Sequence, residues 1–575
     1  MERMTRSVLA CIFALLAACG GDDGGDGGDD GDGGPGDGDD LFARDLLEVS
    51  IEMDAASWDQ LRHQIKTRHS QYGRESCRDA PAPNPYTWFA ATVTIDGEEV
   101  QATGVRKKGN LGSQSTLIPS MKLRFDEFVS DQRFHGLDRL ALNNSKADPS
   151  FARTCLGYAM FAAAGIAAPR CTYAHVVVNG QDLGPYVVID EVQEQFLARH
   201  FERADGNLYE GTACDFRDDA IGGFEQETNQ ESDPSRADLA GVLDALSAED
   251  DQLRERLADT VDLPEFIKFW AIESLVWHRD GYSGNANNFF VYADPAAGGR
   301  FRFIPWGPDA AYHFDSKDTV PDSVLAYGVL ANRLYAIPAE RDRYYELLEK
   351  ELDDLWDPEA MTAEAARVSG LVRPLLPREV RGEHDDDRAD LEAFIGGRRA
   401  ALEQIMADEY PDWTDGLRVL PCRPPVAPVS GTFTTTWDSL ADDIYAAGSA
   451  TIELELDDET IAPLQAGARA GIYAGTGQDR VQLVYDLSGG RRLTFNVNFP
   501  RDRWFESYMV PGAHPLVSPP MAGTVLYQDV SGDPVVELGR FELGEGTWTF
   551  DEVDTSAGAV VRGSFQGMLF RAPEP

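Results

Sequence analysis

Residues 270–315 read WAIESLVWHRDGYSGNANNFFVYADPAAGGRFRFIPWGPDAAYHFD, and the rest of the chain is organised around this stretch. An apolar run with helical spacing ends near Leu275 and leads into a polar loop that begins at His278. Two apolar stretches, Phe289–Tyr292 and Phe301–Ile304, follow with the length and composition of strands. The stretch therefore predicts a helix, a polar loop and a strand pair.

The polar residues of this stretch suit metal-assisted phosphoryl transfer. Asp280 lies in the loop, Asp309 lies just past the second strand, and Asn285 and Asn288 lie between them. Hard cations prefer oxygen ligands, so an Asn and an Asp can hold Mg²⁺ against phosphates while the other Asp orients an acceptor hydroxyl. Residues 278–285 also satisfy the catalytic-loop pattern H-R-D-x-x-x-x-N of protein kinases. Taken alone, the match favours an exposed polar loop, because no Asp-Phe-Gly motif or G-x-G-x-x-G loop accompanies it.

The first nineteen residues have the pattern of a secretion signal. A positively charged start precedes an apolar core at Val8–Ala18, and the small-residue cleavage site Leu-Ala-Ala-Cys ends at Cys19. This box resembles the signal of bacterial lipoproteins, which implies a lipid on the Cys19 thiol and a protein exported to the outer membrane or cell surface. The alternative is an ordinary secretion signal that happens to contain Cys19. Residues 20–40, nearly all Gly and Asp, predict a flexible tether because they offer nothing apolar to bury.

Charge and size narrow the classes of function. The net charge of −47 argues against nucleic-acid binding. The residues after the tether suffice for two or more domains with their own cores. One basic, glycine-bearing patch stands out at Gly104–Ser113, where Arg106, Lys107 and Lys108 follow one another. Cations and spare backbone N–H groups suit a polyphosphate, although an exposed basic turn has the same composition.

A strand and a following acidic residue extend this phosphate hypothesis. Met121–Phe125 alternates as a strand and puts Lys122 and Arg124 on one face. A strand lysine after a glycine loop occupies the position of a phosphate-pairing lysine, but a solvent-facing lysine is equally consistent with the spacing. Residues 190–192 are expected to open a helix. Glu191 is then a candidate ion-pair partner of Lys122, or a first-turn acid stabilised by the helix dipole.

The C-terminal part has a different composition. Residues 421–430 begin with PCRPPVAP and are expected to be a linker. Beyond them, alternating Thr-, Val- and Tyr-rich segments flank turns such as Ser488–Gly490. This pattern predicts a separate antiparallel β domain over residues 431–575, which we expect to be a β-sandwich without a catalytic site.

Five cysteines remain after Cys11 and Cys19, and an exported protein is expected to form disulfides. Connectivity cannot be derived from sequence alone. Of the possible pairs, Cys155 with Cys171 is the one that we expect.

Several sequence blocks occur in order around the opening stretch: Phe134-His135-Gly136-Leu137, Leu142-Asn143-Asn144, Asp148-Pro149-Ser150-Phe151, Ala164-Gly165-Ile166-Ala167-Ala168-Pro169-Arg170, Val178-Asn179-Gly180 and Asp205-Gly206-Asn207-Leu208-Tyr209. Together they resemble the CotH family of spore-coat-protein-H-like atypical kinases. Residues 280–309 resemble the family signature as well, an Asp followed by Asn-aromatic-aromatic and by Ile-Pro-Trp-x-x-Asp. The resemblance covers roughly residues 85 to 410.

The resemblance implies an α+β fold, with an atypical protein-kinase-like domain over residues 41–420 ahead of the β domain. It also implies a secreted or surface enzyme that uses ATP with Mg²⁺ or Mn²⁺ to phosphorylate Ser or Thr of proteins. By position, Lys122 would contact phosphate with the support of Glu191, Asp280 would be catalytic, and Asp309 would bind the metal.

Two points stay open within the resemblance. The Asn ligand of the metal is either Asn288, before the aromatic pair, or Asn285, at kinase spacing. Many relatives have an Asp where this chain has Gly307, so one potential metal ligand is missing. The alternatives are therefore a catalytically degenerate scaffold with a structural or adhesive role at the cell surface, or transfer of another group from the nucleotide.

Overall fold

The computed structural model describes residues 38–314, 320–407, 409–518 and 520–573. The predicted signal, Cys19 and most of the predicted tether lie outside these residues. The last tether residues begin helix α2 (Asp39–Phe42), where Asp40 pairs with His135 at 2.5 Å. Among the described residues, no helix combines the length and apolar character needed to cross a bilayer.

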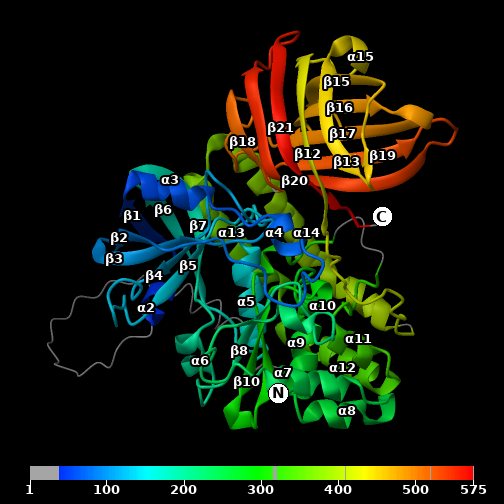
Figure 1. Cartoon of the computed structure of the whole chain (residues 1–575). Coiled ribbons are helices and arrows are strands. Elements are labelled where there is room, and N and C mark those ends of the chain that lie inside the picture. Colours follow the sequence, from blue (N-terminus) through cyan, green and yellow to red (C-terminus); the bar gives the residue numbers. More distant parts are fainter. Residues whose placement is uncertain (1–37, 315–319, 408, 519, 574–575) are drawn as a thin grey trace.

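Seven strands near the N-terminus close into a barrel, blue to cyan in Figure 1. Their order is β1-β2-β3-β4-β5-β7-β6, antiparallel throughout except for the parallel pair of β1 with β6. The strands are β1 (Leu47–Met53), β2 (Phe89–Ile95), β3 (Glu98–Lys107), β4 (Met121–Arg124), β5 (Arg139–Asn143), β6 (Cys171–Val178) and β7 (Gln181–Ile189). Alternate residues such as Val93, Leu123 and Val188 are buried in its core, so the period-two pattern of strands sets the inward face.

The opening stretch forms the centre of the second part. Helix α9 (Leu263–Leu275) begins at Asp262, whose side chain accepts a hydrogen bond from the Glu265 N–H at 3.3 Å. Strands β10 (Phe289–Asp294) and β11 (Arg300–Pro305) pair as predicted. They join β8 (Leu208–Gly211) and β9 (Glu225–Gln226) in a sheet of order β11-β10-β8-β9.

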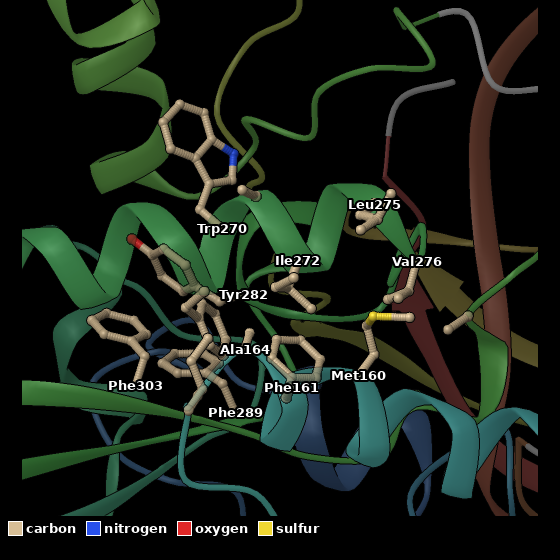
Figure 2. Packing of buried hydrophobic residues seen from close by; sticks show 14 of the residues in the cluster. Met160, Phe161, Ala164, Trp270, Ile272, Leu275, Val276, Tyr282, Phe289 and Phe303 are labelled. Atoms are coloured by element: carbon tan, nitrogen blue, oxygen red, sulfur yellow. The ribbon is translucent and has the colours of Figure 1, made fainter. Parts of the chain in front are cut away.

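Aromatic packing joins this sheet to the helices. Helix α5 (Arg153–Ala163) lies against α9, and Phe161 approaches Phe269 with ring centres 5.3 Å apart. Figure 2 shows residues of α5 and α9 converging with Tyr282, Phe289 and Phe303 in one apolar cluster. This core fixes where α9 ends, and so positions the polar loop that follows it.

The remaining helices surround α9 or cover the edges of the sheets. Trp270 of α9 lies 4.1 Å, between ring centres, from Tyr344, which belongs to one of these helices. They are α3 (Ala55–His63), α4 (Arg68–Tyr72), α6 (Glu194–His200), α7 (Ala237–Leu246), α8 (Asp250–Ala258), α10 (Tyr282–Asn285), α11 (Val329–Tyr335), α12 (Pro338–Leu355), α13 (Pro358–Val372) and α14 (Arg381–Met406).

The C-terminal part is one antiparallel ten-stranded sheet, yellow to red in Figure 1. Its order is β14-β13-β12-β21-β20-β19-β17-β16-β15, and β18 pairs with β20. The strands are β12 (Pro425–Thr436), β13 (Ser449–Leu456), β14 (Glu459–Thr460), β15 (Gln465–Tyr473), β16 (Gln478–Asp486), β17 (Arg491–Phe499), β18 (Gly512–Leu516), β19 (Ala522–Asp529), β20 (Val536–Val553) and β21 (Val560–Arg571), with the short helix α15 (Ile444–Ala447).

The expected sandwich of two sheets is corrected to this single curled sheet. β20 is 18 residues long and carries bulges, which let one continuous ladder bend around its own core. The bend brings β15 back to β12, where the Thr435 hydroxyl donates to the Ala468 carbonyl at 2.9 Å. β12 begins at Pro425, inside the stretch expected to be a linker.

Within the described residues, two disulfides link separate segments of the chain. Cys155 and Cys171, the pair expected from the sequence, link α5 to β6 across 16 residues. Cys77 and Cys422 join residues 345 apart, connecting the segment before β2 to the segment before β12. Cys214 is buried and reduced.

We predict that the long-range disulfide is worth more to stability than the short one. A cross-link limits the unfolded chain more when it closes a longer loop, by about 6 kcal/mol for Cys77–Cys422 against about 3 kcal/mol for Cys155–Cys171 in the chain-entropy treatment. The double variants Cys77→Ser/Cys422→Ser and Cys155→Ser/Cys171→Ser should therefore both melt below the oxidised wild type. The first should show the larger drop in calorimetry, and an equal or reversed order would contradict the prediction.

Candidate active site

A cavity of about 630 Å³ lies between the barrel and the four-stranded sheet. All eight residues selected from the sequence for nucleotide, metal or catalytic roles line it: Arg106, Lys108, Lys122, Glu191, Asp280, Asn285, Asn288 and Asp309. They come from strands, turns and loops up to 203 positions apart (106 to 309). The fold thus brings Arg106, Lys108, Lys122 and Glu191 into one cavity with the polar residues of the segment 280–309.

Lys122 and Glu191 form an ion pair on the barrel side of the cavity, with Nζ and Oε1 2.9 Å apart. Lys122 points from β4, and Glu191 lies in the turn after β7. The expectation that Glu191 opens a helix is wrong, since α6 begins at Glu194. Burial raises the pKa of Glu191, but the charge and hydrogen bond of Lys122, together with the charges of Arg139 and Lys108, act in the opposite direction and lower the pKa overall. Glu191 is therefore ionised and holds the lysine in place.

The three cationic side chains of the basic patch make different contacts. β3 continues to Lys107, which also lines the cavity and whose Nζ donates to the Arg62 carbonyl at 2.6 Å. Arg106 stacks over Trp88, 4.6 Å from the ring centre. Lys108 reaches into the cavity, where burial and then the charge of Lys122 lower its pKa to about 8. An anion placed here relieves both effects, which is the electrostatic condition for a polyphosphate site.

Three amide groups hold the Asp280 carboxylate. Asn285 donates to Oδ1 at 2.6 Å, and Asn287 and Asn288 donate to Oδ2 at 3.2 and 2.8 Å. Burial raises the pKa of Asp280, and the hydrogen bonds of Asn285 and Asn287 act in the opposite direction. Asn287 was not predicted from the sequence, although the run Asn285-Ala286-Asn287-Asn288 contains it.

The same contacts distinguish the two candidate Asn ligands. The Asn285 carbonyl oxygen accepts a hydrogen bond from Arg418 Nε at 2.6 Å, so this oxygen is engaged. Asn288 uses its amide nitrogen on Asp280 and directs its side chain toward Gly307. Its position beside Asp309 in the same cavity makes Asn288 the better candidate for a metal ligand.

A buried carboxylate beneath the loop fixes its course. Glu273 of α9 accepts hydrogen bonds from the backbone N–H groups of Tyr282 and Ser283, both at 2.8 Å. Gly281 is required here, because a Cβ atom would lie 2.2 Å from Glu273 Oε1. His278 is buried, and burial lowers its pKa to about 4, so its neutral ring donates through Nε2 to the Trp306 carbonyl at 3.0 Å. The loop is therefore anchored to both α9 and β11.

Asp309 lies in the turn η3 (Pro308–Ala310) after β11. Burial, and after it the charge of Asp280, raise the pKa of Asp309 to about 7. The charge of Asp280 thus disfavours the ionised form of Asp309. The two carboxylates and the Asn288 amide line one cavity and form an oxygen-rich set that fits a divalent cation. Gly307, where the family resemblance implies an Asp, has φ +49°, and a Cβ atom there would lie 3.3 Å from the Asn288 side chain.

A second acidic group lines the cavity and was not recognised in the sequence. Glu210 of β8, Glu225 of β9 and Glu227 bring carboxylate oxygens within 4.8 Å of one another. Burial, followed by the charge of Glu210, raises the pKa of Glu225 and raises that of Glu227 to about 7. These side chains could also hold a metal ion, and they meet only because β8 and β9 pair.

Comparison with known proteins finds a family match over the part of the chain that contains these cavity residues. The family model described as CotH kinase protein matches residues 105–393. Inner spore coat protein H of Bacillus subtilis (strain 168) is 25% identical over 285 residues, 47% of this chain and 77% of that protein. Invasin CotH2 of Rhizopus delemar is 22% identical over 261 residues, 41% of this chain and 44% of that protein. The family match spans the cavity's phosphate-binding candidates and both aspartates, and ends before the C-terminal sheet.

We predict that anion binding in the cavity weakens as Lys108 loses its proton. Its lowered pKa, about 8, means that the lysine is charged at pH 7 and increasingly neutral above pH 8. Titration calorimetry with tripolyphosphate should give a dissociation constant that rises between pH 7 and pH 9. Lys108→Arg keeps its charge over this range and should remove most of the rise. An equal pH dependence in both proteins would contradict the assignment.

Proposed function

Because the chain belongs to the CotH kinase family, we propose that it is an atypical kinase that transfers the γ-phosphoryl group of ATP to Ser or Thr side chains of proteins at the cell surface. The observation that carries this proposal is the convergence in one cavity of the Lys122–Glu191 ion pair with Asp280 and Asp309. Phosphoryl transfer depends mainly on positioning and on charge stabilisation, and these residues supply both.

Each group in the cavity has a role in this reaction. Lys122 and Lys108 bind the phosphates, and Glu191 keeps Lys122 directed at them. Asp280, held by three amides, orients the acceptor hydroxyl and accepts its proton. Asn288 and Asp309 would hold Mg²⁺ or Mn²⁺, which supplies positive charge to the phosphates when bound.

The fold has the two-part form expected of a kinase. The barrel carries the phosphate-pairing lysine and its carboxylate partner, and the helical part with the four-stranded sheet carries both aspartates. The cavity lies between the two parts. We therefore assign the barrel as the small lobe of an atypical kinase and the helical part as its large lobe.

The site of action follows from the N-terminal sequence. A lipoprotein-type signal ending at Cys19 and a Gly/Asp tether would hold the enzyme at a membrane surface outside the cytoplasm. The two disulfides support export, because such bonds persist in oxidising compartments. Protein acceptors at the cell surface would then be its partners.

One observation favours a second candidate. The family resemblance implies a carboxylate at the position of Gly307, and the lack of this ligand supports a degenerate kinase-like scaffold with a structural or adhesive role at the surface. The retention of charged groups in a buried cavity supports the enzyme instead, because buried charges are costly unless they are paired or bind a ligand.

Replacement of the catalytic carboxylate tests the first candidate. In Asp280→Asn, transfer of labelled phosphate from γ-labelled ATP to a generic Ser/Thr acceptor such as casein should fall by at least about 10²-fold, the usual contribution of a positioned base. Asp251→Asn changes an exposed carboxylate of α8 and should retain full activity. Wild-type transfer by Asp280→Asn would overturn the proposed role.

Restoring the missing carboxylate separates the two candidates. Gly307→Asp adds an oxygen ligand beside Asn288, and Asp tolerates the left-handed backbone of this position. We predict that the Mn²⁺ concentration for half-maximal stabilisation by ATP, measured as a rise in melting temperature, falls by about tenfold. Gly307→Asn has the same shape without the charge and should change it little. A scaffold would show no ATP-dependent stabilisation in the wild type, and equal effects of Asp and Asn would contradict the ligand assignment.

A further inference from the structure

The loop that lines the phosphate side of the cavity has no regular structure of its own. It runs from Lys108 to Ser120 between β3 and β4, and residues 108–113 all face the cavity. Such a loop is ordered only if other parts of the molecule hold it. Its second half, residues 114–118, is held mainly by contacts from distant segments.

Part of that support comes from the C-terminal sheet domain. The connection between β17 and β18 places Trp504 over the loop, where its carbonyl accepts the N–H groups of Thr116 and Leu117 at 2.8 and 3.2 Å. The same carbonyl accepts the Ser115 hydroxyl. The Glu506 N–H donates to Thr116 Oγ1 at 3.2 Å. One segment of the C-terminal domain thus supplies hydrogen-bond partners to three consecutive residues of the loop.

A lysine from the barrel completes this contact. Lys146, just after β5, donates to the Gln114 carbonyl at 2.7 Å. Its Nζ also lies 4.5 Å from the ring centre of Phe505, a residue only 5% exposed. Asn144 next to it donates to the carbonyls of Ser113 and Ile118 at 3.2 and 2.7 Å. The loop is therefore clamped between the end of β5 and the C-terminal domain.

A second contact joins the C-terminal domain to segments that line the cavity. Glu542 of β20 pairs with Arg68 at 3.4 Å and with Arg423, and both arginines line the cavity. The Arg423 N–H also donates to the carbonyl of Tyr72, another lining residue. The C-terminal domain thus contacts the loop and, separately, residues that line the cavity.

We propose that the C-terminal sheet domain is a positioning element of the active site, which holds the loop 108–118 in its phosphate-binding conformation through Trp504, Phe505 and Glu506. A loop that is already ordered loses less conformational entropy when the ligand binds, so the clamp increases affinity without touching the phosphates. The proposal rests on the proposed function for the identity of the ligand, ATP. The clamp itself is a property of the fold.

The test uses the full chain and the double variant Thr116→Val/Phe505→Ala. It removes the hydroxyl that accepts from Glu506 and the ring that packs on Lys146, while all cavity residues remain. Hydrogen–deuterium exchange of residues 110–118, without nucleotide, should become at least about tenfold faster. With ATP, KM should rise about tenfold while kcat stays within about twofold, the pattern of lost ground-state positioning.

Two controls separate the clamp from general destabilisation. Phe433→Ala removes a buried ring of the same domain, 2% exposed and packed on Trp548, away from the loop. Below its melting temperature, it should leave the exchange of the loop and KM unchanged. Thr116→Ser with Phe505 intact keeps the accepting hydroxyl and should behave like the wild type.

The outcomes for clamp and function are distinct. Unchanged loop exchange in the double variant overturns the clamp, whatever the enzyme transfers. An equal rise of KM in Phe433→Ala also overturns it, since the effect would then come from domain stability. Faster loop exchange in a protein whose wild type binds no nucleotide would retain the clamp and reject the kinase.

Discussion

The ion pair of Lys122 with Glu191 is the interaction on which the site depends. Glu191 is 5% exposed, and among the cations that favour its ionised form Lys122, 2.9 Å away, contributes most. Removal of either partner would leave an uncompensated charge at the barrel wall, which costs several kcal/mol in buried pairs. The pair also connects β4 to the segment after β7, so it links two strands of the barrel that are not neighbours in the sheet.

The helical part of the cavity also contains partly buried carboxylates, Asp280 and Asp309, but among the described residues they are not held by an ion pair like that of Glu191. Asp280 and Asp309 both have raised pKa values, and the structure provides amides for Asp280 while leaving Asp309 near a cationic lysine. The backbone that carries them is fixed by Glu273, a third buried carboxylate. A bound cation would offset the repulsion between Asp280 and Asp309. Metal binding is therefore expected to favour the ionised form of both carboxylates.

The sequence predicted the helix, loop and strand pair of residues 263–305 because their apolar periods are local and strong. It selected cavity residues well where a short motif surrounds them, as for Asp280 and Asp309. It missed Arg418, Glu210 and the Cys77–Cys422 bond, since each depends on a contact between distant segments that leaves no local pattern. The sandwich prediction was wrong because strand periodicity does not tell whether a ladder continues or divides.

The same reasoning explains why the C-terminal domain looked unrelated to the site in sequence. Its strands carry no catalytic pattern, and its contacts to the loop use mainly the backbone of Trp504 and Glu506. Nearly every residue type has the same backbone N–H and carbonyl groups, so these contacts leave no sequence motif. In a chain with a net charge of −47, an ordered cationic loop also concentrates positive charge where the proposed nucleotide would bind. A domain that keeps this loop ordered therefore serves both the geometry and the electrostatics of the cavity.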